Sequence, residues 1–183
     1  MTTLESILAI AAHQLPAAGV DCLLIGGFAV NYHGYTRNTL DVDFMIVAEQ
    51  MDTVRRIMSQ TGFTNITIED NVTFFTSAHS SLRADFLRVD RETMGKLMAN
   101  ASCASVHGFE LKVPALKDLL AMKIFALSQD VARRMGKDLP DIAYLSVLHN
   151  LDLTADLLPL CSRFGTPQVY ELIRTHVDAL RTP

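Results

Sequence analysis

The stretch from residue 24 to residue 46 constrains the fold of this chain more than any other. An apolar run ends at Gly26-Gly27, and about a dozen residues later a second apolar run opens with Asp41-Val42-Asp43. Glycines that follow an apolar run favour a tight turn, and short apolar runs bounded by turn residues favour strands. The pattern predicts a strand, a glycine turn, a short helix and a second strand that carries two carboxylates.

The composition is that of an ordinary globular protein. The 183 residues are 49% hydrophobic and 20% charged, which predicts a single domain with a substantial core. No apolar stretch approaches the ~20 residues that span a bilayer, and the N-terminal segment lacks the basic region of a signal peptide. Three isolated cysteines are typical of reduced thiols in a cytoplasmic protein. A net charge of −4 argues against a broad nucleic-acid surface, although it is compatible with a local basic groove.

The predicted elements divide into a mixed half and a helical half. Apolar periodicity predicts helices over residues 4–15 and 51–60. Strands are predicted over residues 20–25, 41–47, 63–68, 72–76 and 82–89, and a hairpin within 103–113. Beyond Pro114, helices are predicted over roughly residues 115–128, 139–150, 154–164 and 167–180. We therefore expect an α/β (α+β) core over residues 1–113 and a helical C-terminal region over residues 114–183 that packs on it.

Asp41 and Asp43 are the first candidate site residues. Residues two apart in a strand project from the same face, roughly 6–7 Å apart. Two such carboxylates suit hard divalent cations whose ligand shell is completed by substrate phosphates. With 14 Asp in the chain, about one Asp-x-Asp is expected by chance. The alternative is a solvated strand edge without a chemical role.

Gly26-Gly27 is the second candidate. Glycines after a strand let the backbone approach a phosphate closely, and the helix that follows offers free N–H groups. The alternative is a tight turn that binds nothing. The two motifs in this order and at this spacing are more specific than either alone, and together they predict a holder for a nucleoside triphosphate (NTP) and its metal ions.

The Gly-Gly turn, the short helix and the pattern Arg37-x-Thr39-x-Asp41-x-Asp43 resemble the signature of the DNA polymerase β-type nucleotidyltransferase superfamily. The likeness is to its small bacterial members, which include the AbiEii-like abortive-infection toxins and minimal nucleotidyltransferases. It covers residues 20–90 well and residues 114–145 more loosely. It implies a short mixed sheet with packed helices, and nucleotide contacts from Gly26, Gly27, Arg37 and Thr39. The family commonly has Gly-Ser at the turn, so here phosphate contacts would rest on backbone N–H groups and on Arg37.

The superfamily also uses a third carboxylate on a neighbouring strand. Asp85, in the predicted strand 82–89, is the candidate. The resemblance implies that Asp41 and Asp43 hold the triphosphate metal. Asp85 would help to activate the attacking hydroxyl, as general base or through a second metal. The alternative for Asp85 is an exposed residue that alternates with apolar neighbours.

In the helical half, the helical period places Lys123 in the middle of a leucine stripe. A lysine at such a position snorkels, pairs with a carboxylate or points into a cavity. AbiEii-like families have a lysine at a comparable place, and the resemblance implies that Lys123 contacts the triphosphate or a carboxylate.

The same families have an arginine and a basic-Asp-x-x-Asp motif after this lysine. The present chain has Arg133-Arg134 followed by Lys137-Asp138-Leu139-Pro140-Asp141, so Lys137, Asp138 and Asp141 are further candidates. The alternative is structural: Asp138 would cap a helix, with Pro140 in its first turn and negative charge that suits the helix dipole.

The function that the resemblance implies is transfer of a nucleoside monophosphate from an NTP to an acceptor hydroxyl, with Mg²⁺ or Mn²⁺ as cofactor. The acceptor is open among RNA, a protein side chain and a small molecule of the aminoglycoside or lincosamide type. A toxin would in addition have a cognate antitoxin as its partner, and no membrane partner is expected. One alternative is a non-catalytic nucleotide-binding or interaction protein that keeps the fold. Another is an unrelated α/β domain in which the Asp pair is coincidental.

Overall fold

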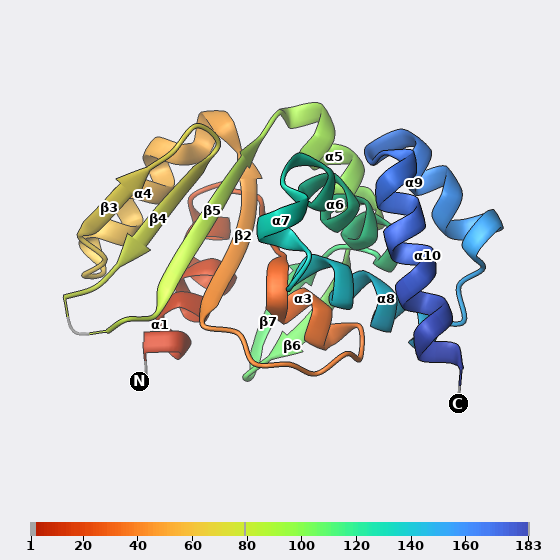
Figure 1. The fold of residues 1–183 in the computed structure, drawn as a ribbon. Helices are drawn as coiled ribbons and strands as arrows, with labels where there is room; N and C mark the ends of the chain where they lie inside the picture. The colour runs from red at the N-terminus through yellow and green to blue at the C-terminus, as the bar shows by residue number, and fades with distance from the viewer. Residues whose placement is uncertain (1–2, 79, 183) are drawn as a thin grey trace. The chain divides into compact units, whose positions relative to one another are not determined.

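The computed structural model describes residues 3–78 and 80–182, and these fall into two compact units. Unit 1 contains the described chain through Tyr32 and again from Arg37 to Ala115. Unit 2 contains His33–Thr36 and the chain from Leu116 onward. Unit 1 is the mixed α/β part and unit 2 is helical (Figure 1).

Unit 1 is built on a mixed sheet, in which the described strands have the order β3-β4-β5-β2-β1-β7-β6. Figure 1 shows β3, β4, β5 and β2 side by side in this sheet. The central strands β2 and β5 are parallel, and β1 is antiparallel to β2 and parallel to β7. The hairpins β3–β4 and β6–β7 form the two edges. The strand bounds are β1 Cys22–Leu24, β2 Asp41–Val47, β3 Asn65–Ile68, β4 Val72–Thr76, β5 Arg83–Val89, β6 Ser102–Val106 and β7 Phe109–Val113.

Helices connect these strands. Their bounds are α1 Thr3–Ala9, the π-helix η1 Ile10–Gln14, α2 Leu15–Ala17, α3 Gly26–Tyr32, the 3₁₀ helix η2 Ala48–Gln50, α4 Met51–Gln60 and α5 Arg91–Asn100. In α4 the buried residues Met51, Val54 and Met58 follow the helical period, so one stripe of the helix enters the core. No helix in residues 3–78 and 80–182 has both the length and the apolar character needed to cross a lipid bilayer.

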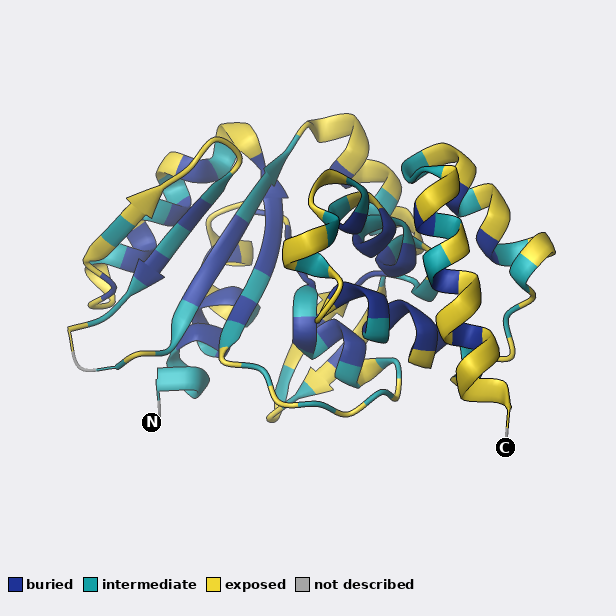
Figure 2. Ribbon diagram, in the orientation of Figure 1, coloured by how far each residue is buried: buried dark blue, intermediate teal, exposed yellow. Residues whose placement is uncertain are grey.

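Unit 2 is a group of helices in which α8 packs against α6 and α10, and α6 also packs against α9. The bounds are α6 Leu116–Gln129, α7 Val131–Arg134, α8 Asp138–Leu148, the π-helix η3 Leu153–Leu157, α9 Leu158–Phe164 and α10 Pro167–Arg181. Along α10 the buried residues Val169, Ile173 and Val177 recur every four positions, and Figure 2 shows buried and exposed segments alternating along this helix. Thr166 caps α10 by accepting a hydrogen bond from the Val169 N–H at 3.2 Å.

The segment His33–Thr36 attaches to α8 although it lies in the chain between α3 and β2. The rings of Tyr35 and Tyr144 stack with centroids 4.5 Å apart, and Nε2 of His149 lies 2.8 Å from the His33 carbonyl oxygen. Gly34 has a φ of +100°, and a Cβ at this position would lie 2.8 Å from Cδ2 of Leu148. Helix α8 therefore holds the segment that joins the glycine turn to the Asp-x-Asp strand.

The structure confirms the predicted fold class, a mixed α/β protein with packed helices. The predicted strand over 41–47 and helix over 51–60 match β2 and α4 in both bounds. The prediction was wrong over residues 91–100, where no element was expected and α5 forms. Asp90 caps α5 through the Thr93 N–H at 2.8 Å, but Met94 is its buried residue, so the helix has no apolar stripe to reveal it. The short helix α7 was also missed.

Candidate active site

The pairing of β2 with β5 brings the three predicted aspartates to one face of the sheet. In this parallel pair Asp43 lies opposite Asp85, and Asp41 lies opposite Arg83. Neighbouring strands are ~4.8 Å apart, and residues two apart in a strand share a face. Asp41, Asp43 and Asp85 therefore project together from the same side.

The opposite face of the same strands is apolar, and it fixes the register. Phe44 and Phe86 stack with centroids 5.2 Å apart, and Phe75 of β4 contacts Phe86 edge-on at 5.5 Å. All three rings are buried. A slip of one residue would move these rings out of the core and the carboxylates into it, so burial of the rings holds the aspartates in place.

Gly26 packs directly against Asp43. The glycine has a φ of +62°, and the Ile25 N–H donates a 2.8 Å hydrogen bond to the Asp43 carbonyl. A Cβ at Gly26 would lie 2.7 Å from the Cβ of Asp43 and closer still to its carboxylate. Glycine is therefore required here for two reasons: the left-handed backbone and the space that the Asp43 side chain fills.

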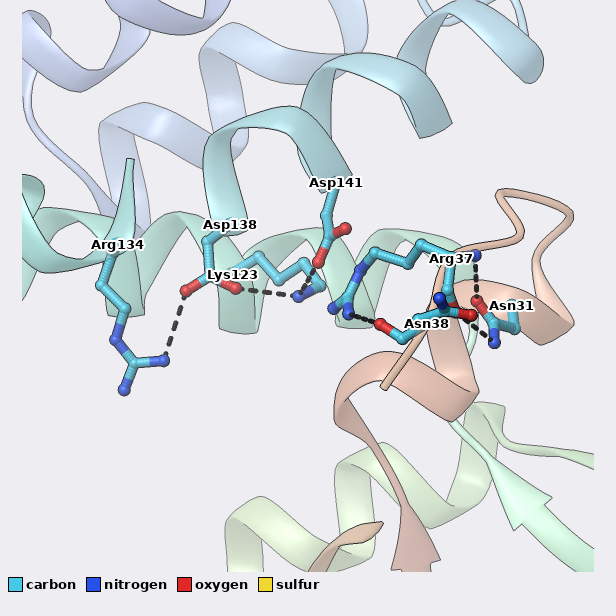
Figure 3. Close-up of polar contacts among 7 residues, drawn as sticks. All are labelled: Asn31, Arg37, Asn38, Lys123, Arg134, Asp138 and Asp141. Carbon is cyan, nitrogen blue, oxygen red and sulfur yellow. Dashed lines mark hydrogen bonds and ion pairs between the residues drawn. The ribbon is translucent and has the colours of Figure 1, made fainter. Parts of the chain in front are cut away.

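Gly27 packs closely against the segment that precedes β2, as Gly26 packs against Asp43. A Cβ at Gly27 would lie 2.6 Å from Oγ1 of Thr39 and 3.2 Å from Nη1 of Arg37. The Thr39 hydroxyl donates to the Asp41 carbonyl at 3.2 Å. The backbone of Arg37 is held by Asn31, which accepts from its N–H and donates to its carbonyl, both at 3.0 Å (Figure 3). Gly27 thus lies against the segment that carries the other predicted nucleotide contacts, Arg37 and Thr39.

Arg83 is a residue of this site that the sequence reasoning missed. Its Nε and Nη2 donate to the two oxygens of Asp85 at 2.6 and 2.7 Å, and Nη2 also reaches Asp41 at 3.3 Å. Its guanidinium carbon lies 4.4 Å from the centroid of the Phe74 ring. The available signal was its position two residues before Asp85, which places both side chains on one face of a strand.

Burial raises the pKa of Asp85 to about 6. The hydrogen bonds from Arg83 oppose this shift, whereas the neighbouring charges of Asp43 and Asp41 add to it. A carboxylate whose pKa lies near neutrality is suited to accept a proton from a substrate hydroxyl.

The donor set fits a hard divalent cation in its chemistry, because carboxylate oxygens on adjacent strands can share one ion. Among the described residues, no group of three or more His, Cys, Asp or Glu side chains is arranged so that it could hold a metal ion. Two of the three carboxylates bind the Arg83 guanidinium instead.

In unit 2, Lys123 forms a buried ion cluster with the predicted Asp-x-x-Asp motif (Figure 3). Its Nζ lies 2.8 Å from Asp138 and 2.7 Å from Asp141, and Arg134 reaches Asp138 at 3.3 Å. The Lys123 side chain is 6% exposed, which excludes snorkelling.

The start of α8 shows which residue caps this helix and what the Asp138 carboxylate binds. Lys137, which is exposed, occupies the N-cap position, and Asp138 is the first helical residue. The structural alternative in which Asp138 caps α8 was therefore wrong. Its carboxylate binds Lys123 and Arg134, because their opposite charges compensate a buried carboxylate better than N–H groups alone.

The sequence of the chain matches a known protein family. A sequence model of the family described as nucleotidyl transferase AbiEii toxin, type IV TA system, matches residues 80–181. No curated protein matches the chain.

Three of the solved structures that share the fold illustrate the likeness. An antigenic nucleotidyltransferase-like protein from Paracoccidioides brasiliensis is 16% identical, with 93% of this chain and 92% of that chain covered and a TM-score of 0.56. ANT(2″)-Ia in complex with adenylyl-2″-tobramycin is 14% identical, with 98% and 99% covered and a TM-score of 0.57. The lincosamide antibiotic adenylyltransferase LnuA, bound to lincomycin, is 14% identical, with 80% and 97% covered and a TM-score of 0.56. The match over residues 80–181 covers more than half of the chain, which therefore belongs to the AbiEii nucleotidyl transferase family and is a nucleotidyltransferase.

Proposed function

We propose that the protein transfers a nucleoside monophosphate from an NTP to an acceptor hydroxyl, with release of pyrophosphate and with Mg²⁺ or Mn²⁺ as cofactor. Family membership supports nucleotidyl transfer in general. The main support for a metal-dependent mechanism is the β2–β5 register. It places Asp43 opposite Asp85, on the same face of the sheet as Asp41.

Each carboxylate has a role in this proposal. Asp41 and Asp43 would hold the cation, which when bound supplies positive charge to the triphosphate and to the leaving pyrophosphate. Asp85, whose pKa burial raises to about 6, would activate the acceptor hydroxyl, either by accepting its proton or by holding a second cation together with Asp41. Gly26 keeps the Asp43 carboxylate in place by leaving room for it.

The phosphates would be bound by the residues around the glycine turn. Arg37 supplies a guanidinium suited to phosphate oxygens, and Thr39 a hydroxyl. The N–H groups of Gly26 and Gly27 would add hydrogen bonds. Lys123 has carboxylate partners in its own cluster, so its contact with the triphosphate stays a prediction. The candidate site roles of Lys137, Asp138 and Asp141 also stay predictions.

The biological setting is proposed from the family description, which names a toxin of a type IV TA system. We propose that the protein acts as a toxin in the cytoplasm, where NTPs are present, and that a cognate antitoxin counteracts it. The acceptor is proposed among RNA, a protein side chain and a small molecule. Induced expression of the wild type should stop growth, and the Asp43→Asn variant should not.

The test of the function is label transfer. The protein is incubated with Mg²⁺ and with each NTP in turn, radiolabelled at the α-phosphate, together with total RNA, cell extract or candidate small molecules. Label should enter one acceptor class with wild-type protein and none with Asp43→Asn, which keeps the size of the side chain but removes a metal-binding charge. Transfer that Asp43→Asn retains in full would refute the assigned site.

A further inference from the structure

Arg83 uses the same oxygens that the proposed function assigns to the metal. Both oxygens of Asp85 accept hydrogen bonds from its guanidinium, at 2.6 and 2.7 Å, and Asp41 lies 3.3 Å from Nη2. A divalent cation on Asp85 and Asp41 would lie within a few ångströms of the guanidinium charge. In a partly buried site, like charges this close repel strongly, so the two cations compete for the carboxylates.

Arg83 is the partner that can move. Its side chain is 39% exposed, against 10% for Asp85. Asp85 is fixed in a strand paired on both sides, with Asp43 opposite it on β2 and Phe74 on β4. The guanidinium lies over the Phe74 ring, and because the Arg83 side chain is partly exposed it can turn toward solvent without any movement of the sheet.

We propose that Arg83 is an internal counter-ion, which neutralises Asp85 and Asp41 in the metal-free protein and which a divalent cation must displace. The proposal rests on the proposed function of these carboxylates. Whenever no divalent cation is bound, the guanidinium compensates part of the repulsion among the three aspartates. It also makes the site weak for a bare cation. A cation that arrives with an NTP gains phosphate ligands, which offset the cost of displacing Arg83.

The test compares two arginines of β5. Arg83→Gln removes the counter-ion. Arg88→Gln makes the same change of net charge on the same strand, but Arg88 donates to the carbonyls of Glu69 and Asp70, at 2.6 and 2.7 Å, and not to the carboxylates. Mn²⁺ binding to the full chain is measured without nucleotide, at mildly alkaline pH, from the electron paramagnetic resonance signal of free Mn²⁺. We expect Arg83→Gln to bind Mn²⁺ at least about tenfold more tightly than the wild type, and Arg88→Gln to match the wild type.

Equal or weaker binding by Arg83→Gln would overturn the proposal, because Arg83 would then support the site and not compete for it. Asp43→Asn separates this failure from failure of the proposed function. If Asp43→Asn weakens Mn²⁺ binding in the presence of an NTP analogue but Arg83→Gln does not tighten it, only the counter-ion role fails. If Asp43→Asn has no effect on Mn²⁺ binding, the metal site itself is refuted.

A measurement on the wild type avoids any dependence on how the variants fold. In nuclear magnetic resonance spectra of arginine side chains, the Nε–H signal of Arg83 should shift when Mg²⁺ is added, because its bond to Asp85 breaks. The Nε–H signal of Arg88 should stay in place. An Arg83 signal that saturating Mg²⁺ leaves unchanged would overturn the proposal.

Discussion

The carboxylate of Asp43 fills the space that a side chain at Gly26 would occupy. The glycine turn and the Asp-x-Asp strand are therefore one packed unit, although they are separated by a helix and a loop. Any change that adds a side chain at Gly26 must move a residue of the proposed metal site.

Gly26→Ala should destabilise the protein by about 2–4 kcal/mol, as the sum of the left-handed backbone and the overlap with Asp43. Gly19→Ala is the matched control. Gly19 also has a positive φ, of +73°, but a Cβ there would meet nothing within 4 Å. The control should lose only about 1–2 kcal/mol. Urea unfolding gives both values, and equal losses would show that the contact with Asp43 is not tight.

Lys123→Met should destabilise the protein by about 3–5 kcal/mol, because it leaves Asp138 and Asp141 buried without their shared cation. Lys117→Met, on the same helix, also breaks a lysine–aspartate pair of 2.8 Å, but the Lys117 side chain is 63% exposed. Water screens the charges of that exposed pair, so Lys117→Met should change the free energy of unfolding far less than Lys123→Met. Thermal and chemical unfolding of both variants tests the difference. A small loss for Lys123→Met would mean that the buried cluster does not need its lysine.

The contribution of Asp85 to the stability of the metal-free protein should fall as the pH rises from about 4 to about 6. The folded state raises the pKa of Asp85 from 3.8 to about 6, so in this window the folded protein holds a proton that the unfolded chain has lost. Asparagine does not titrate, so Asp85→Asn should remove this part of the pH dependence. The substitution can otherwise shift the free energy of unfolding only by an amount that does not vary with pH. The check is the free energy of unfolding across pH in the presence of a chelator. Parallel curves for the wild type and Asp85→Asn would show that burial does not perturb this carboxyl.

Asp41→Asn and Asp43→Asn should each abolish nucleotide transfer and leave the stability of the metal-free protein nearly unchanged or slightly raised, because close like charges repel. Mg²⁺ together with an NTP should stabilise the wild type by binding linkage and should stabilise the variants much less. Thermal unfolding with and without Mg²⁺–NTP measures both effects. Destabilised variants and an unresponsive wild type would mark these carboxylates as structural.

The features that the sequence predicted well are those carried by local periodicity. Strand β2 is an apolar run that opens with two aspartates, and α4 has a clear apolar stripe, so each could be located from its own residues. Helix α5 could not be located in this way, because its sequence signal is the N-cap residue Asp90 and no apolar stripe follows along the helix. The attachment of Tyr35 to Tyr144 depends on residues more than a hundred positions apart, and no local pattern encodes it.

The same limit applies to the site. Asp41, Asp43 and Asp85 could be named from motif and strand position, but their grouping depends on the β2–β5 register, which the buried phenylalanines determine. Arg83 was missed because an arginine in a strand is ordinary until its cross-strand neighbour is known to be Asp41. The partners of Lys123 were present in the predicted motif, yet only the packing of α6 against α8 makes them a buried cluster.

The most direct test of the central claim, that Asp41, Asp43 and Asp85 form one metal site, is diffraction at the manganese absorption edge. Crystals of the wild type would be grown with Mn²⁺ and an NTP analogue that cannot be cleaved. We expect an anomalous peak bound by the carboxylates of Asp41 and Asp43, next to Asp85 and the triphosphate, with the Arg83 guanidinium no longer on Asp85. A triphosphate bound with no manganese at these carboxylates, or with manganese at other residues, would contradict the claim.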